Sequence, residues 1–210
     1  GGEERFAALC EVLSAARPDV LVLQECNGWE DSGRLRELAQ VLHIPDDEQH
    51  LFLSHSNARG SGMRYHLALL SRIPFSSARV HKEGVAHSIF EARLPGSEPG
   101  KERVLFGAHL IAANEDARLA ETDVLLSLVE PCLARGEEVI LAGDLNSLSP
   151  ADPYPEDLDE RFARLGIMVG LEGRRIRKNF LALREQDRGS GAASASQADQ
   201  EQQRSNGESE

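Results

Sequence analysis

The chain has no long apolar run and few basic residues for its 210-residue length. No hydrophobic stretch approaches the ~20 residues that a helix needs to cross a bilayer, so the sequence predicts no transmembrane segment. Lys and Arg total 23 against 35 Asp and Glu, for a formal charge of −12. This balance argues against a basic nucleic-acid-binding face. The one basic cluster, residues 174–178, is more typical of a solvated helix face than of a phosphate contact.

Cysteine is also scarce. The three cysteines, Cys10, Cys26 and Cys132, show no spacing such as Cys-x-x-Cys that would indicate a metal site. Each lies in an apolar stretch, so we expect buried free thiols. Free thiols favour a reducing, intracellular compartment.

Hydrophobic spacing predicts alternating helices and strands up to residue 150. The predicted helices span 3–16, 31–42 and 116–135, and the predicted strands span 18–25, 51–53, 66–71, 79–81, 88–94, 104–110 and 139–142. Short connections with Gly and Pro join most of the strands, so neighbouring strands should be antiparallel. Because strands and amphipathic helices both need a covered apolar face, we expect two sheets flanked by helices.

Beyond Pro150 the composition changes. Residues 151–187 are rich in acids and prolines and have only a weak helical pattern, which predicts a divergent acidic loop and helical extension. Residues 188–210 contain no aromatic or large aliphatic residue. Such a stretch cannot bury enough surface to offset its ordering entropy, so a disordered tail is expected. The sequence therefore predicts one domain over 1–150 followed by these two segments.

The most informative stretch is VILAGDLNSLSP, residues 139–150. An aliphatic strand leads there into a turn that contains Asp144 and Asn146. Because side chains alternate along extended backbone, these two are predicted to point the same way. A carboxylate and an amide so placed suit a phosphate oxygen, an attacking water or a hard cation. Taken alone, the stretch is better explained as an ordinary strand and turn, for which these residue types are common.

Two further strands end in polar residues. The run PDVLVLQEC terminates in Gln24 and Glu25, and the run VLFGAHL carries His109 near its end. By itself, Glu25 would more often cap an exposed strand end, and His109 would more often be a satisfied core or rim residue. The order of the three runs along the chain argues against coincidence.

In these runs the sequence resembles the endonuclease/exonuclease/phosphatase superfamily of metal-dependent phosphoesterases, which includes deoxyribonuclease I-like nucleases, sphingomyelinases and inositol phosphatases. The matching segments are PDVLVLQEC, GMRYHLALLSRIPF, LFGAHLIAANEDARLAETDVLL and VILAGDLNS, in family order over positions 3–150. The Gln-Glu and Gly-Asp-Leu-Asn motifs are specific. The resemblance implies an α+β fold, a four-layer α/β/β/α sandwich of two mostly antiparallel sheets.

The resemblance also implies divalent-metal-dependent hydrolysis of a phosphoester. Glu25 would hold Mg²⁺ or Mn²⁺, which needs hard oxygen ligands. Asp144 would orient or deprotonate the attacking water, while Asn146 and His109 would donate hydrogen bonds to the phosphate. Arg118 would be an ion-pair partner rather than a catalyst. Loops set the substrate in such families, so nucleic acid, a lipid headgroup and a small phosphoester all remain open, as does the oligomeric state.

Two features of the family have no counterpart in the sequence. Family members begin with a strand that carries an asparagine and close with an Asp-His pair, but this chain opens on Gly-Gly-Glu and contains no Asp-His dipeptide. The candidate carboxylates after Asn146 are Asp152, Glu156, Asp157, Asp159 and Glu160. We therefore expect a partial domain, truncated at both ends, with open sheet edges and poor or absent turnover.

Two non-enzymatic alternatives follow from the same absences. One is a catalytically inactive family remnant that acts as a binding or scaffold protein. The other is a small α/β binding module that resembles the family only locally, which would hold if the matching motifs failed to converge in space.

Overall fold

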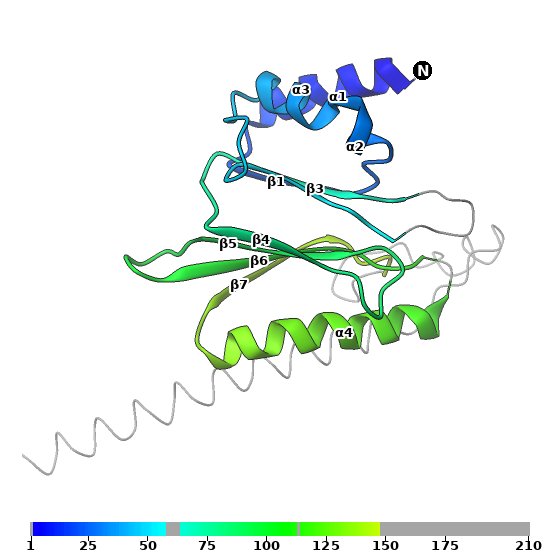
Figure 1. Cartoon of the computed structure of the whole chain (residues 1–210), viewed down its shortest axis with the longest axis vertical. Helices are drawn as coiled ribbons and strands as arrows, with labels where there is room; N and C mark the ends of the chain where they lie inside the picture. The colour runs from blue at the N-terminus through cyan, green and yellow to red at the C-terminus, as the bar shows by residue number, and fades with distance from the viewer. Residues whose placement is uncertain (1, 58–63, 113, 148–210) are drawn as a thin grey trace, which may run out of the picture. The chain divides into compact units, whose positions relative to one another are not determined.

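The computed structural model describes residues 2–57, 64–112 and 114–147 (Figure 1). Within it, residues up to Asn146 form one compact unit. The acidic extension, the predicted tail, the basic cluster at 174–178 and the candidate carboxylates after Asn146 lie outside the described residues.

The described residues form four helices and seven strands. In chain order these are α1 (Gly2–Ala16), β1 (Val20–Leu23), α2 (Trp29–Ser32), α3 (Arg34–Val41), β2 (Leu51–Ser54), β3 (Leu67–Ser71), β4 (Ser77–His81), β5 (Ile89–Pro95), β6 (Glu102–His109), α4 (Glu115–Ala134) and β7 (Glu138–Asp144). Each helix and strand predicted between residues 3 and 142 is present, with one difference. The single helix predicted over 31–42 is divided at Gly33, whose φ of 71° is left-handed and cannot continue a right-handed helix.

The strands form two sheets. One has the order β1-β3-β2 and the other the order β4-β5-β6-β7. Every pairing is antiparallel except that of β6 with β7, which is parallel. The helix α4 supplies the long crossover that a parallel neighbour requires. The prediction of two mostly antiparallel sheets is confirmed.

Three apolar cores separate four layers of secondary structure (Figure 1). Helices α1 to α3 cover the three-stranded sheet through a core that includes Phe6, Trp29, Leu38 and Leu70. The two sheets pack face to face through Leu67, Leu69, Phe90, Ala92 and Leu105. The four-stranded sheet packs on α4 through Val104, Phe106, Leu125, Val129 and Cys132. Successive residues of a strand thus enter different cores, as a pleated strand requires, and the four-layer α/β/β/α sandwich is confirmed.

The structure bears on two of the sequence-based predictions, the absence of a transmembrane segment and the free cysteines. None of the helices in the described residues is both long enough and apolar enough to cross a membrane. All three cysteines are free thiols, with Cys26 and Cys132 buried and Cys10 partly so. The compartment stays a prediction.

Candidate active site

The strand β7 ends beside the end of β6, and this pairing joins two of the predicted site residues. In the parallel register, Asp144 is the partner of His109. The backbone N–H of Leu110 donates to the carbonyl oxygen of Asp144 over 2.9 Å, which extends the pairing by one residue. Residues far apart in the sequence therefore carry a carboxylate and an imidazole side by side at one end of the sheet.

A glycine allows the two strands to meet this closely. Gly143 has a φ of 151°, and a Cβ atom on it would lie 1.9 Å from the carbonyl oxygen of Ala108. Real Cβ atoms essentially never approach so near. The glycine of the Gly-Asp-Leu-Asn motif is therefore required for the pairing that places Asp144 next to His109.

Asn146 lies in a turn rather than on the strand, so the alternation argument for Asp144 and Asn146 was wrong. The strand ends at Asp144, and Asn146 has a left-handed φ of 50°. Its backbone N–H donates to Oδ1 of Asp144 over 2.8 Å, which is an Asx turn. Its side-chain Nδ2 donates to the carbonyl oxygen of Leu110 over 2.7 Å. Asn146 is thus held next to His109 by hydrogen bonds, not by strand geometry.

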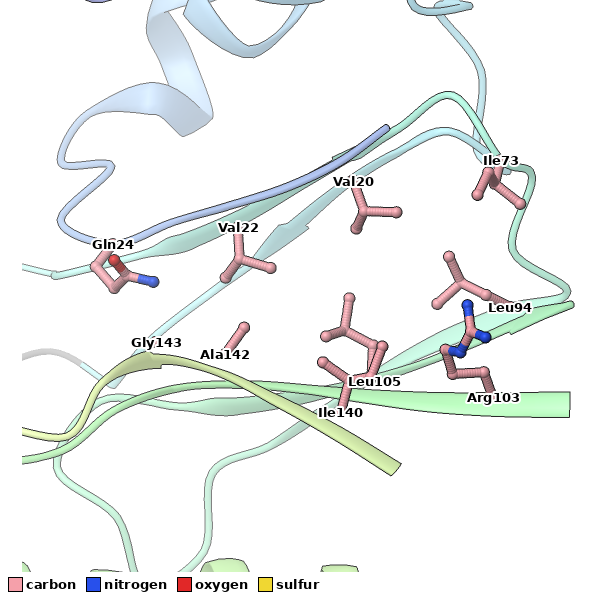
Figure 2. Close-up of a pocket in the computed structure, with 10 residues that line it drawn as sticks. All are labelled: Val20, Val22, Gln24, Ile73, Leu94, Arg103, Leu105, Ile140, Ala142 and Gly143. Carbon is pink, nitrogen blue, oxygen red and sulfur yellow. The ribbon is translucent and has the colours of Figure 1, made fainter. Parts of the chain in front are cut away.

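Glu25 belongs to the facing sheet. It follows β1 with a left-handed φ of 57° and is exposed. The preceding residue, Gln24, lines a cavity of about 340 Å³ between the edge strands β1 and β7. Figure 2 shows Gln24 at the same end of this cavity as Gly143. The chain segments that lead into Glu25 and Asp144 therefore flank one end of the cavity, and the convergence of Glu25 with His109, Asp144 and Asn146 on one cleft stays a prediction.

The exposed carboxylates near the cavity are the type of ligand that binds a divalent cation, but they are few. Carboxylates are hard oxygen ligands, and Mg²⁺ is commonly held by one or two of them together with water and substrate phosphate. Among the described residues, no group of three or more His, Cys, Asp or Glu side chains is placed to hold a metal ion. Glu25 therefore suits an open Mg²⁺ or Mn²⁺ site, in which water and substrate supply the other ligands, better than a closed four-ligand site.

Two aromatic rings that the sequence analysis did not identify pack against His109. The ring of His87 stacks on it with centroids 4.7 Å apart and planes 26° apart. The ring of Tyr65 meets both edge-on, at 5.1 Å from His87 and 6.2 Å from His109. The Nδ1 atom of His109 is buried and has no hydrogen-bond partner within the described part of the chain. Buried polar atoms are normally paired, so His109 is an exception among the described residues.

A second missed histidine supports the loop that contains Glu25. His66 is fully buried, and its Nδ1 accepts a hydrogen bond from the backbone N–H of Ser56 over 2.9 Å. Its proton is therefore on Nε2, which lies 3.1 Å from Oε1 of Glu30. The backbone N–H of Glu30 and then His66 lower the pKa of Glu30 below its usual value. The carbonyl of His66 accepts the N–H of Cys26 over 2.9 Å, which anchors the chain directly after Glu25.

Three serines connect the two sheets at this end. The hydroxyls of Ser54 and Ser88 are 2.8 Å apart, and those of Ser56 and Ser88 are 3.0 Å apart. Ser56 also donates to the carbonyl of Tyr65 over 2.6 Å. Tyr65 and His66 fall in the family-like segment GMRYHLALLSRIPF, which was the available signal for them, whereas His87 lies in no motif.

Comparison with known proteins identifies the class. The chain belongs to the Endonuclease/Exonuclease/phosphatase family, whose sequence pattern matches residues 1–199. The matched region thus continues beyond residue 150. The predicted domain boundaries stay a prediction. A search of curated protein sequences found no match.

Several solved structures share the fold. A functionally unknown conserved protein from Enterococcus faecalis V583 has a TM-score of 0.54 at 17% identity, over 70% of this chain and 60% of its own. Truncated TDP2 from Caenorhabditis elegans has a TM-score of 0.50 at 23% identity, over 73% and 59%. The mannosyl-6-phosphatase of Bacteroides thetaiotaomicron VPI-5482 has a TM-score of 0.51 at 16% identity, over 78% and 63%. This chain spans about 60% of the first two structures, and identities this low establish the fold alone.

Proposed function

We propose that this chain carries a divalent-metal-dependent phosphoester hydrolase site at the ends of β1, β6 and β7. The observation that carries the proposal is the pairing of His109 with Asp144 on parallel strands, with Asn146 held beside them through Leu110. Membership in the Endonuclease/Exonuclease/phosphatase family supports the reaction class.

Glu25 is the proposed metal ligand, on the opposite side of the cavity end from β7. As an exposed carboxylate it offers hard oxygen atoms, which Mg²⁺ and Mn²⁺ prefer. When bound, the ion supplies a Lewis acid that polarises the phosphoryl group and stabilises charge on the leaving oxygen. The anchoring of Cys26 to His66 limits the movement of the chain next to Glu25.

The other three residues act on water and phosphate. Oδ1 of Asp144 accepts the N–H of Asn146, so its second oxygen orients or deprotonates the attacking water. An amide nitrogen has two hydrogens, and Nδ2 of Asn146 uses one on Leu110, so the other donates to a nonbridging phosphate oxygen. The His109 ring donates its N–H to the same phosphate.

An assay of metal-dependent turnover tests the proposal. The purified chain is incubated with bis(p-nitrophenyl) phosphate, p-nitrophenyl phosphate and mannose 6-phosphate, with Mg²⁺, with Mn²⁺ and with EDTA. The sugar phosphate is included because one of the similar structures is a mannosyl-6-phosphatase. We expect turnover that EDTA removes and Mg²⁺ restores.

Two matched variants test whether the activity depends on Asp144. Asp144→Ala should lower the rate by about 10²–10⁴-fold, the usual contribution of a positioned acid or base. Asp123→Ala removes the same group from an exposed position on α4 and should leave the rate unchanged. Turnover that survives Asp144→Ala would overturn the proposal.

Calorimetric titration with Mg²⁺ separates the inactive alternative from the enzyme. A remnant that serves as a binding or scaffold protein would bind Mg²⁺ weakly, lose that binding in Glu25→Ala and release no product from any substrate. Such a result would replace hydrolysis with phosphate or metal binding as the role of the site. The small donor set among the described residues is the observation that favours this alternative.

A further inference from the structure

The ring plane of His109 is set by its neighbours. The last torsion of a histidine is broad, so the side chain has no strong intrinsic preference for the direction of its ring. No described residue hydrogen-bonds to Nδ1 of His109 and fixes the ring from that side. The stacked ring of His87 and the edge of Tyr65 occupy this environment instead. Aromatic pairs at these separations have preferred relative orientations.

A buried carboxylate bridges the loop that contains His87 and the segment that follows His109. Glu121, on α4, is 4% exposed. Its Oε1 accepts the backbone N–H of Ala86 over 2.6 Å, and its Oε2 accepts that of Ile111 over 2.7 Å. Ala86 directly precedes His87, and Ile111 lies two residues after His109. The side chain of Glu121 therefore fixes the segment before β5 relative to the segment after β6.

Other contacts fix the same loops. Arg118, one turn before Glu121 on α4, donates from Nη1 to the carbonyls of Ile111 and Ala112, each over 2.7 Å. On the other side, the backbone N–H of Asn57 donates to the carbonyl of His87 over 3.0 Å. The His87 loop is thus held both by α4 and by the segment that follows β2.

We propose that His87 is a positioning residue, which stacks on His109 and fixes its ring for phosphate contact, and that Glu121 holds the two loops that bring these rings together. The inference rests on the proposed function, because it assigns His87 a task only through His109. The stacking of His87 on His109 differs from ordinary packing in an apolar core. Both rings are polar and buried, His109 is the register partner of Asp144, and neither ring is a member of the three apolar cores.

Ring NMR of the full chain tests the stacking. The ¹⁵N-detected resonances of His109 are assigned by their loss in His109→Gln and followed during titration with inorganic phosphate in the presence of Mg²⁺. His87→Ala should move the His109 resonances and weaken phosphate binding by about threefold to tenfold, the value of one aromatic pair. His87→Phe keeps a flat ring without nitrogen and should restore both to within about twofold.

Glutamine tests the role of Glu121. In Glu121→Gln the amide keeps one acceptor but presents a donor to the second backbone N–H, so one loop is released. We expect the His109 resonances to move in the same direction as in His87→Ala. Glu130→Gln, on an exposed position of the same helix, is the control and should leave them in place.

The outcomes separate this inference from the proposed function. If His87→Ala lowers only the melting temperature and leaves the His109 resonances and phosphate affinity unchanged, His87 is a packing residue and the inference is wrong. If His87→Phe is as impaired as His87→Ala, a ring nitrogen of His87 acts directly and the positioning role is also wrong. A chain without turnover whose His109 responds as expected would remove the hydrolase proposal and leave the positioning of His109 supported.

Discussion

Asn146 donates an amide hydrogen to the carbonyl oxygen of Leu110 over 2.7 Å, and this bond ties the loop after β7 to the residue that follows His109. The backbone of Asn146 is left-handed, with φ of 50°. Asparagine adopts this conformation more readily than most residues. Asn146 therefore combines a backbone requirement with a side-chain contact, and the two can be separated by mutation.

Comparison of Asn146→Gly with Asn146→Ala separates the effect of the side-chain hydrogen bond from the effect of the left-handed backbone. Both variants lose the bond to Leu110, and both should show the same loss of activity and of phosphate affinity. Only alanine adds left-handed strain, so Asn146→Ala should be less stable than Asn146→Gly by about 1 kcal/mol in urea unfolding. Full activity in Asn146→Gly would show that the amide has no role in the site.

Gly143→Ala should destabilise the chain by about 3 kcal/mol, because the added methyl group overlaps the carbonyl of Ala108 in the neighbouring strand. Gly136→Ala is the matched control. Gly136 also has a positive φ, of 71°, but a Cβ atom there meets nothing within 4 Å. Its cost should be limited to backbone strain of about 1 kcal/mol. Equal unfolding midpoints for the two variants in urea would contradict the close approach of β7 to β6.

Acid should destabilise the chain partly through Glu137. Hydrogen bonds from Arg135 and then Arg93 lower the pKa of Glu137 from 4.5 to about 2. A depressed folded-state pKa means that the ion pairs contribute stability above about pH 4.5 and lose it progressively as the pH falls towards 2. Glu137→Gln should therefore be less stable than the wild-type chain at pH 7 and converge with it near pH 2.

Urea midpoints measured at several pH values between 2 and 7 check this prediction, within the window set by the two pKa values. Glu83→Gln removes a carboxylate from an exposed position and serves as the control. A stability difference between Glu137→Gln and wild type that does not change with pH would show that the arginine contacts are not what Glu137 contributes.

Cys26 should resist thiol reagents in the folded chain. Burial raises its pKa to about 12, and the thiolate is the reactive form. At pH 8 we expect slow labelling of Cys26 by iodoacetamide until urea unfolds the chain, while the partly exposed Cys10 reacts first. Peptide mass spectrometry over time measures both rates. Rapid native-state labelling of Cys26 would place it outside the core beneath α1 and α3.

Much of the fold could be predicted from local patterns. The alternation of apolar residues along Ile89–Pro95 and the helical spacing along Glu115–Ala134 each mark the face that must be buried. The division at Gly33 was missed because the apolar stripe that predicts the helix begins only at Leu35, so it carries no information about the backbone at Gly33. The aliphatic runs also placed His109 and Asp144 at strand ends, with Glu25 and Asn146 two residues beyond their strands.

The sequence by itself determined which residues form strands and helices, which faces are apolar and which motif residues follow the strands, because these depend on neighbours a few positions apart. Only the tertiary structure decided that Asp144 pairs with His109, that His87 stacks on that ring and that Glu121 bridges their loops. These contacts join distant segments. They depend on the register of β6 with β7 and on the packing of α4 and the two sheets, and no local periodicity encodes that geometry.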